Sequence, residues 1–195
     1  MRQELGHVTK EGEYFHQLDV ELIEKMRRRA DVEERRLHMA EASQINDPNI
    51  LETLEKLGYN PTTVSLLHFV PLVQVAWAGG SVRHAERDRV LAIAYLHGVN
   101  ENTPTYQQLV AWLDQPPPEE FFRGTLRAIR AHLGSLRQNE RTATQDAIMH
   151  CCTDVASAAG WHLGRIGAAK RKLLEEIQKE LEPESQVAAS AGVQS

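Results

Sequence analysis

The sequence PTTVSLLHFVPLVQVAWAGG, residues 61–80, decides the fold class of this chain. It follows Asn60, and a capping residue followed by proline is typical of a helix start. We expect the helix to run to Trp77, where Gly79-Gly80 end it. A helix that is apolar on all sides lies at the centre of a helical protein, so this segment predicts the buried helix of a bundle. The apolar residues that support this are Val64, Leu66, Leu67, Phe69, Val70, Leu72, Val73, Val75 and Trp77.

The rest of the chain also has helical patterns. Asp47-Pro48 and Thr103-Pro104 are further helix starts, and the proline run at residues 116–118 prevents any helix from continuing through it. No segment shows the alternation of apolar and polar residues that strands require. The sequence therefore predicts an all-α protein, a helical bundle, with further helices over residues 11–43, 47–58, 84–97, 103–115, 119–136, 139–159 and 168–181.

The first helix differs from the others, because its apolar stripe is thin and its second half is almost entirely charged. Such a stripe cannot bury a helix by itself. We therefore divide the chain into an N-terminal helical extension (residues 1–45), a helical domain that folds without it (47–182) and a disordered tail (183–195). The extension is expected to bind a protein partner or a second copy of the chain. Its stripe consists of Phe15, Leu18, Leu22, Met26, Ala30, Leu37 and Ala40.

Composition narrows the class of function. The 195 residues are 42% hydrophobic and 25% charged, with a net charge of −5. The one dense basic run, at residues 27–29 and 35–36, alternates with acidic residues, so a nucleic-acid partner is not expected. No stretch reaches the roughly 18 apolar residues of a membrane span, and no signal peptide is found, so we expect a cytoplasmic protein. Cys151 and Cys152 are adjacent on one helix and are expected to be free, partly buried thiols.

Two segments, residues 77–86 and 161–170, align without gaps, and each passes from a helix end through a glycine turn into a new helix. The longer sequences VPLVQVAWAGGSVRHAERDRVLAIAYLHGV (70–99) and GRIGAAKRKLLEEI (164–177) resemble the central and closing signatures of the TerB family of tellurite resistance proteins. This resemblance implies a small helical module in stress responses that binds metal or partner proteins and seldom has catalytic activity.

The chain departs from the TerB pattern at the positions that would carry a metal. Gly79 replaces the turn aspartate, Lys170 replaces the closing glutamate, and Arg83 and Gly167 replace serine caps, so Glu86 alone remains of the acidic cluster. Hard divalent cations require several oxygen ligands, so we expect a degenerate site that holds no metal. The sequence also predicts an ion pair between Glu86 and Lys170, because a lysine at a helix start favours a nearby carboxylate.

An alternative class is a helical metal-binding protein or a ferritin-like di-metal enzyme. Glu13 and His16 have the Glu-x-x-His spacing of such sites, and Glu4 with His7 repeats it. The acidic residues and histidine at 146, 150 and 154 do not supply the matching motif. We expect His68 to be buried, with its imidazole hydrogen-bonded to a backbone carbonyl. We prefer this interpretation to a role as a ligand or a pH sensor. Because no nucleophile elbow, phosphate loop or dinucleotide fingerprint is present, we assign no catalytic residue and no cofactor.

Overall fold

The computed structural model describes residues 5–158 and 166–182 of the chain. Within these ranges every secondary-structure element is a helix and none is a strand, which confirms the predicted all-α class. The expected tail (183–195), and residues 161–165 of the second glycine segment, lie outside the described residues. The elements are α1 Leu5–Ser43, α2 Pro48–Lys56, the 3₁₀ helix η1 Val64–Phe69, α3 Val70–Trp77, α4 His84–Leu96, α5 Pro104–Asp114, α6 Glu119–Ser135, α7 Gln138–Ala158 and α8 Ala168–Leu181.

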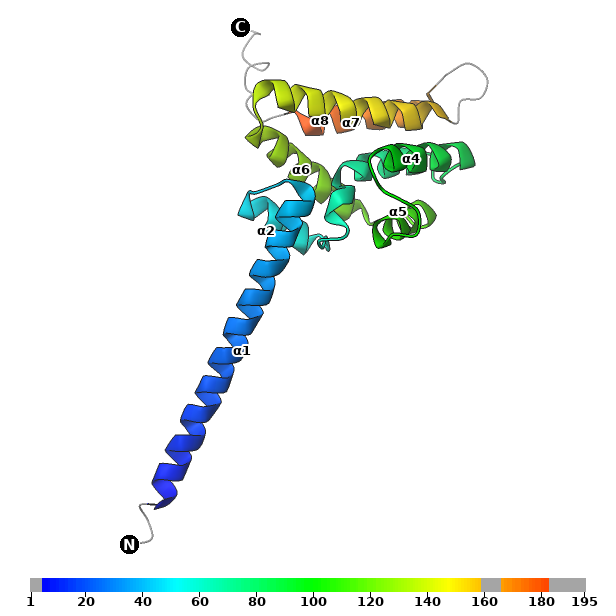
Figure 1. Ribbon diagram of the computed structural model, residues 1–195. Coiled ribbons are helices and arrows are strands. Elements are labelled where there is room, and N and C mark those ends of the chain that lie inside the picture. Colours follow the sequence, from blue (N-terminus) through cyan, green and yellow to red (C-terminus); the bar gives the residue numbers. More distant parts are fainter. Residues whose placement is uncertain (1–4, 159–165, 183–195) are drawn as a thin grey trace.

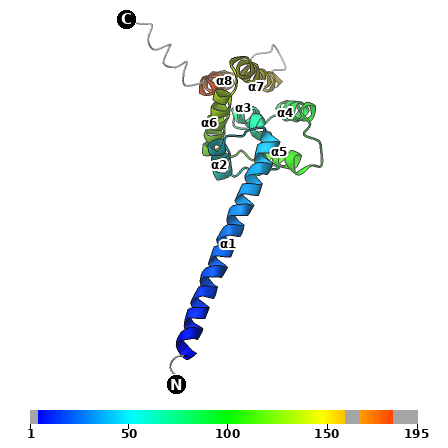
Figure 2. The ribbon, with the colours of Figure 1, turned by 60° about the vertical axis from the view of Figure 1, so that its left-hand side comes forward.

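The short helix α3 lies at the centre of the bundle, as its sequence predicts. It contacts α4, α5, α6, α7 and α8, while α7 and α8 run along each other on the far side from α1 (Figures 1 and 2). Six of its eight residues are buried, including Val73, Val75 and Ala76, which have no exposed surface. Burial of such a helix on every side supplies much of the apolar area that stabilises the domain.

The prediction of one continuous helix from residue 61 to Trp77 is wrong in its first part. The Asn60 side chain accepts hydrogen bonds from the backbone N–H groups of Thr62 and Thr63 at 2.9 and 3.1 Å, which makes a turn of this segment. The chain then forms the 3₁₀ helix η1, and α-helical geometry begins only at Val70. Pro71 explains the change, since it has no N–H to donate to the carbonyl four residues earlier.

Helix α1 has 39 residues, which corresponds to about 58 Å at 1.5 Å per residue. Most of it projects away from the other helices (Figures 1 and 2). Its last turns pack on the domain: Met39 is fully buried, and the Arg36 Nε atom donates to Glu55 at 2.8 Å. Ile45, which follows α1, is 1% exposed. The projecting part of α1 therefore ends before residue 36, whereas the sequence places the domain boundary at residue 45.

The helix starts agree with the sequence signals. The side chain of Asp47 accepts from the Asn49 N–H at 2.8 Å, and the Thr103 hydroxyl accepts from the Tyr106 N–H at 3.1 Å. Both cysteines are free, as expected; Cys152 is buried and Cys151 partly buried, and burial raises the pKa of each thiol. Among the described helices, none combines the length and apolar content needed to cross a membrane.

Candidate functional site

Two of the positions at which the sequence predicted a degenerate metal site, Glu86 and Lys170, lie at the starts of α4 and α8. Glu86 is in the first turn of α4, and its Oε2 atom accepts a hydrogen bond from the backbone N–H of Arg83 at 3.0 Å. A glutamate three residues after the cap commonly closes a helix start in this way. Glu86 is only 1% exposed, so the helix start holds a buried carboxylate that needs further compensation.

That compensation comes from Lys170 in the first turn of α8. Its Nζ atom donates to Oε1 of Glu86, and the two side chains are 11% and 1% exposed. The ion pair predicted from the sequence is therefore confirmed. Both carboxylate oxygens of Glu86 have partners, one from its own helix start and one from α8.

The Glu86–Lys170 pair joins the starts of α4 and α8 and stabilises them. A lysine in the first turn of a helix is unfavourable beside the positive end of the helix dipole, by roughly 0.3–1 kcal/mol, and the Glu86 carboxylate offsets that cost. A buried ion pair contributes little net stability by itself, but the loss of one partner leaves an uncompensated charge.

Gly79 lies in the exposed turn that follows α3. A Cβ atom at this position would meet no atom within 4 Å, so packing does not require glycine here. By contrast, Gly80 has a φ of +83°, a conformation in which glycine is strongly favoured. An aspartate, which the TerB resemblance predicts in this turn, would therefore fit at position 79. Among the side chains that the structure describes, in residues 14–158 and 166–182, no group of three or more His, Cys, Asp or Glu is arranged to hold a metal ion.

The residues of the alternative di-metal hypothesis lie in different parts of the structure. His16 is exposed on the projecting part of α1, while Asp146, His150 and Asp154 belong to α7 on the domain (Figure 1). The structure does not bring these two groups together within one chain. The side chain of Glu13, like Glu4 and His7, lies outside the described residues.

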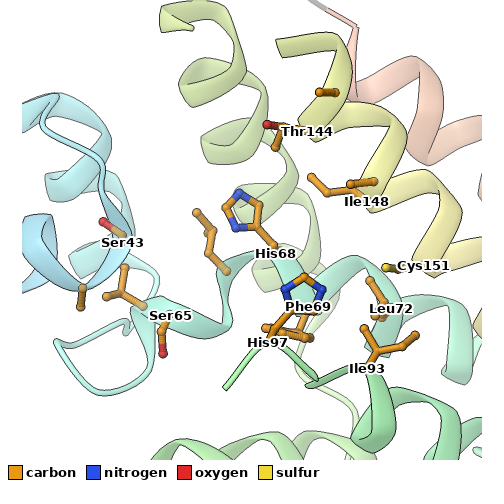
Figure 3. A pocket seen from close by; sticks show the side chains of 15 residues that line it. Ser43, Ser65, His68, Phe69, Leu72, Ile93, His97, Thr144, Ile148 and Cys151 are labelled. Carbon is orange, nitrogen blue, oxygen red and sulfur yellow. The ribbon is translucent and has the colours of Figure 1, made fainter. Parts of the chain in front are cut away.

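His68 lines a pocket of about 530 Å³ between the end of α1, η1, α4 and α7 (Figure 3). Its Nε2 atom is buried and has no hydrogen-bond partner among the described residues, so the expected bond to a backbone carbonyl is wrong for this nitrogen. Burial, with smaller contributions from the neighbouring His132 and His97, lowers the pKa of His68 to about 4. The imidazole is therefore neutral at pH 7.

The pocket itself was not found from the sequence. Its walls come from segments up to about a hundred residues apart, and no local pattern in the sequence brings these segments together. The one available signal was a histidine inside an apolar run.

Comparison with protein-family models, with curated proteins and with solved structures gives no match. The function must therefore be inferred from the chain's own residues.

Proposed function

We propose that this chain is a non-enzymatic, TerB-like interaction module that associates with a second copy of itself through α1. The observation that supports this most is an unpaired apolar stripe on the projecting part of the helix. Its five members are between 42% and 62% exposed, and at 100° per residue they fall within an arc of about 120°. They are Tyr14, Phe15, Leu18, Leu22 and Met26; the last four belong to the stripe predicted from the sequence, and Tyr14 lies on the same helix face.

A stripe of this kind requires a partner. Exposed apolar residues scattered singly are normal, whereas a contiguous row along one helix face marks an interaction surface. The stripe lies on the part of α1 that projects from the domain, so none of the other helices that the structure describes covers it (Figure 1). A helix of the same pattern on a second chain can cover it by packing side chains between side chains.

The spacing of the stripe suits two antiparallel copies. Phe15, Leu18, Leu22 and Met26 are arranged almost symmetrically about residues 20 and 21. In an antiparallel pair centred there, Phe15 of each copy faces Met26 of the other, and Leu18 faces Leu22 or Ile23. A contact over about four turns is at the small end of stable interfaces, so we expect association in roughly the micromolar range.

Charge also favours the antiparallel arrangement. Residues 11–24 contain five acidic and no basic residues, and residues 25–29 contain four basic residues. Antiparallel packing places the basic segment of one copy near the segment of the other that contains Glu11 and Glu13. Parallel packing in register would place the two basic segments side by side, where like charges repel.

The test is the molecular mass of the full chain by analytical ultracentrifugation. We expect a dimer at tens of micromolar. Leu22→Glu should give a monomer, because it places a charge in the apolar seam. Val20→Glu is the matched control: Val20 is 41% exposed but lies about 160° around the helix from Leu22. A monomeric wild-type chain at 100 micromolar, or equal effects of the two variants, would contradict the proposal.

A charge exchange tests the orientation. Replacing Arg28 and Arg29 by glutamate should weaken an antiparallel dimer, since the new acids face acids. Adding Glu11→Lys and Glu13→Lys to the same chain should restore it. In a parallel dimer the glutamates at positions 28 and 29 would not weaken association. A dimer that is unaffected by these two substitutions therefore refutes the antiparallel arrangement.

We also propose that the site at Glu86 and Lys170 is a degenerate metal site. The support is the lysine at a position where the TerB pattern has a carboxylate, together with the two partners of Glu86. Calorimetric titration with Ca²⁺, Mg²⁺ and Zn²⁺ should give no stoichiometric binding at micromolar concentrations. The double variant Gly79→Asp, Lys170→Glu should gain stability from added Ca²⁺ or Mg²⁺. Elemental analysis of the purified chain separates this proposal from the di-metal alternative at Glu13 and His16.

The TerB-like resemblance leads us to propose a role in stress response. A strain lacking the gene should grow normally in ordinary medium and poorly with tellurite or a related oxidant. The Leu22→Glu variant should fail to complement that strain, while Val20→Glu should restore growth. Equal growth of the deleted and intact strains under each stress would remove this part of the proposal.

A further inference from the structure

We propose that Met26 is an oxidation site through which a peroxide reverses the self-association of α1. This inference rests on the proposed dimer and adds a regulation of the same apolar stripe. Oxidation converts the apolar thioether of Met26 into a polar sulfoxide, which separates the two copies. Three features support it: the exposure of Met26, its position in the stripe and the burial of the other methionines that the structure describes.

Met26 is the most exposed methionine among those whose side chains the structure describes. The chain contains four methionines, and Met1 lies outside the described residues. Met26 is 62% exposed, whereas Met39 is fully buried and Met149 is partly buried against the core. A peroxide in solution reaches the exposed sulfur most readily, so Met26 should be oxidised before the other two.

Met26 also lies where a change of polarity acts on the dimer. In the antiparallel pair, Met26 of each copy faces Phe15 of the other, so the two contacts close the two ends of the seam. A methionine sulfur beside an aromatic ring is a favourable contact. The side chain is therefore exposed in the single chain and covered in the pair.

The reaction is a transfer of one oxygen atom with two electrons. A lone pair of the Met26 sulfur forms the S–O bond with one peroxide oxygen, and the O–O bond breaks. The proton of the transferred oxygen passes to the leaving oxygen, which departs as water or an alcohol. The sulfur is oxidised and the peroxide is reduced, so no further reactant is needed. A methionine sulfoxide reductase restores the thioether at the expense of two thiols.

The sulfoxide weakens the dimer because water satisfies its oxygen only in the single chain. Pairing moves this oxygen against the Phe15 ring of the other copy, which has no N–H or O–H group to donate. The burial of one such unpaired polar group should weaken association roughly tenfold. The dimer contains two of these positions, so complete oxidation should weaken it about a hundredfold.

The same coupling makes the dimer protect the sulfur. A peroxide reaches Met26 in the single chain but not in the pair, so the oxidation rate of Met26 should fall as the chain concentration rises through the dissociation constant. Met149 belongs to α7 on the domain, outside the seam. Its oxidation rate should not depend on chain concentration.

The two thiols need a control, because cysteine is also oxidised by peroxide. Burial raises the pKa of Cys151 and of Cys152, which keeps most of each thiol in its less reactive protonated form at pH 7. Cys151 is the more accessible of the two. A Cys151→Ser background therefore removes the thiol that could contribute to the result.

Analytical ultracentrifugation of the full Cys151→Ser chain, before and after hydrogen peroxide, tests the proposal, while mass spectrometry follows the conversion of Met26. We expect a dimer before oxidation, a monomer at the same concentration after it, and a dimer again after treatment with a methionine sulfoxide reductase and dithiothreitol. Met26→Leu is the matched control and should remain a dimer in peroxide. Met26→Gln places a polar group of similar length in the seam and should weaken the dimer without peroxide.

The possible results distinguish this inference from the proposed dimer. A chain that is monomeric before oxidation contradicts both. A dimer that survives complete conversion of Met26, or a Met26→Leu dimer that peroxide dissociates equally well, overturns the inference and leaves the dimer in place. The monomeric variant Leu22→Glu should oxidise at Met26 at one rate at every chain concentration. If the wild-type chain does the same while it forms a dimer, Met26 is not covered and the inference is wrong.

Discussion

The buried pair of Glu86 and Lys170 allows a quantitative test of how the starts of α4 and α8 are held together. Lys170→Met keeps the length of the side chain and removes its charge. The Glu86 carboxylate, 1% exposed, then keeps only its hydrogen bond from the Arg83 N–H. Removing one partner of a buried pair costs about 3–5 kcal/mol, and we expect a loss of unfolding free energy near the lower value, about 3 kcal/mol.

Glu86→Gln is the complementary change. The amide oxygen can still accept from the Arg83 N–H, and the Lys170 ammonium, at 11% exposure, can turn toward water. We expect this variant to lose about 1–2 kcal/mol. The double variant contains no unpaired buried charge, so it should lose less than the sum of the two single changes. The coupling energy should be about 2–3 kcal/mol.

Urea unfolding of the four chains gives this coupling energy directly. The matched control is the pair Arg28 and Glu24, whose N–O distance is 2.9 Å but whose side chains are 77% and 56% exposed. Its cycle should give about 0.3–0.5 kcal/mol, falling in 1 M salt, while the buried pair keeps most of its coupling. Either of two results would show that the two charges are independently solvated. One is a Lys170→Met variant as stable as wild type. The other is a double variant whose loss of unfolding free energy equals the sum of the two single losses.

Three further predictions concern packing, ionisation and the extension. A Cβ atom added to Gly124 would lie 2.5 Å from a methyl carbon of Leu57, so Gly124→Ala should destabilise the domain by about 1 kcal/mol. At Gly134 a Cβ meets no atom within 4 Å, so Gly134→Ala should stabilise α6 by about 0.5–1 kcal/mol. Thermal melting of the two glycine variants measures both changes. Because the pKa of His68 is about 4 in the folded chain and about 6.5 when unfolded, stability should fall by about 3 kcal/mol as the pH drops from 6.5 to 4. His68→Phe should remove that fall in urea unfolding at pH 7, 5.5 and 4.5. Deletion of residues 1–31 should abolish the dimer in ultracentrifugation and preserve a cooperative melt, because the buried residues of α1 follow this segment.

The sequence was most informative where local chemistry determines the result. Helix starts at Asp47 and Thr103 are fixed by side chains that bond to the backbone two or three residues later, so a local pattern suffices to find them. The ion pair of Glu86 and Lys170 could be predicted for a related reason. Each residue is placed by the start of its own helix, and a lysine in the first turn needs a carboxylate nearby.

Features that depend on tertiary contacts were not accessible in the same way. Residues 61–69 are apolar enough for an α-helix, but a missing N–H at Pro71 and the turn at Asn60 make them a turn and a 3₁₀ helix. The burial of Met39 could not be read from a segment that is otherwise charged. Whether Nε2 of His68 finds a partner depends on what five different segments place around it.

The C-terminal end of α1 determines how the exposed stripe leaves the domain. Met39 packs into the core, and the Arg36 Nε atom donates to Glu55 at 2.8 Å. Both contacts lie C-terminal to the stripe, so the deletion of residues 1–31 removes the stripe and leaves these contacts in place. That deletion therefore tests self-association separately from the packing that holds α1 on the domain.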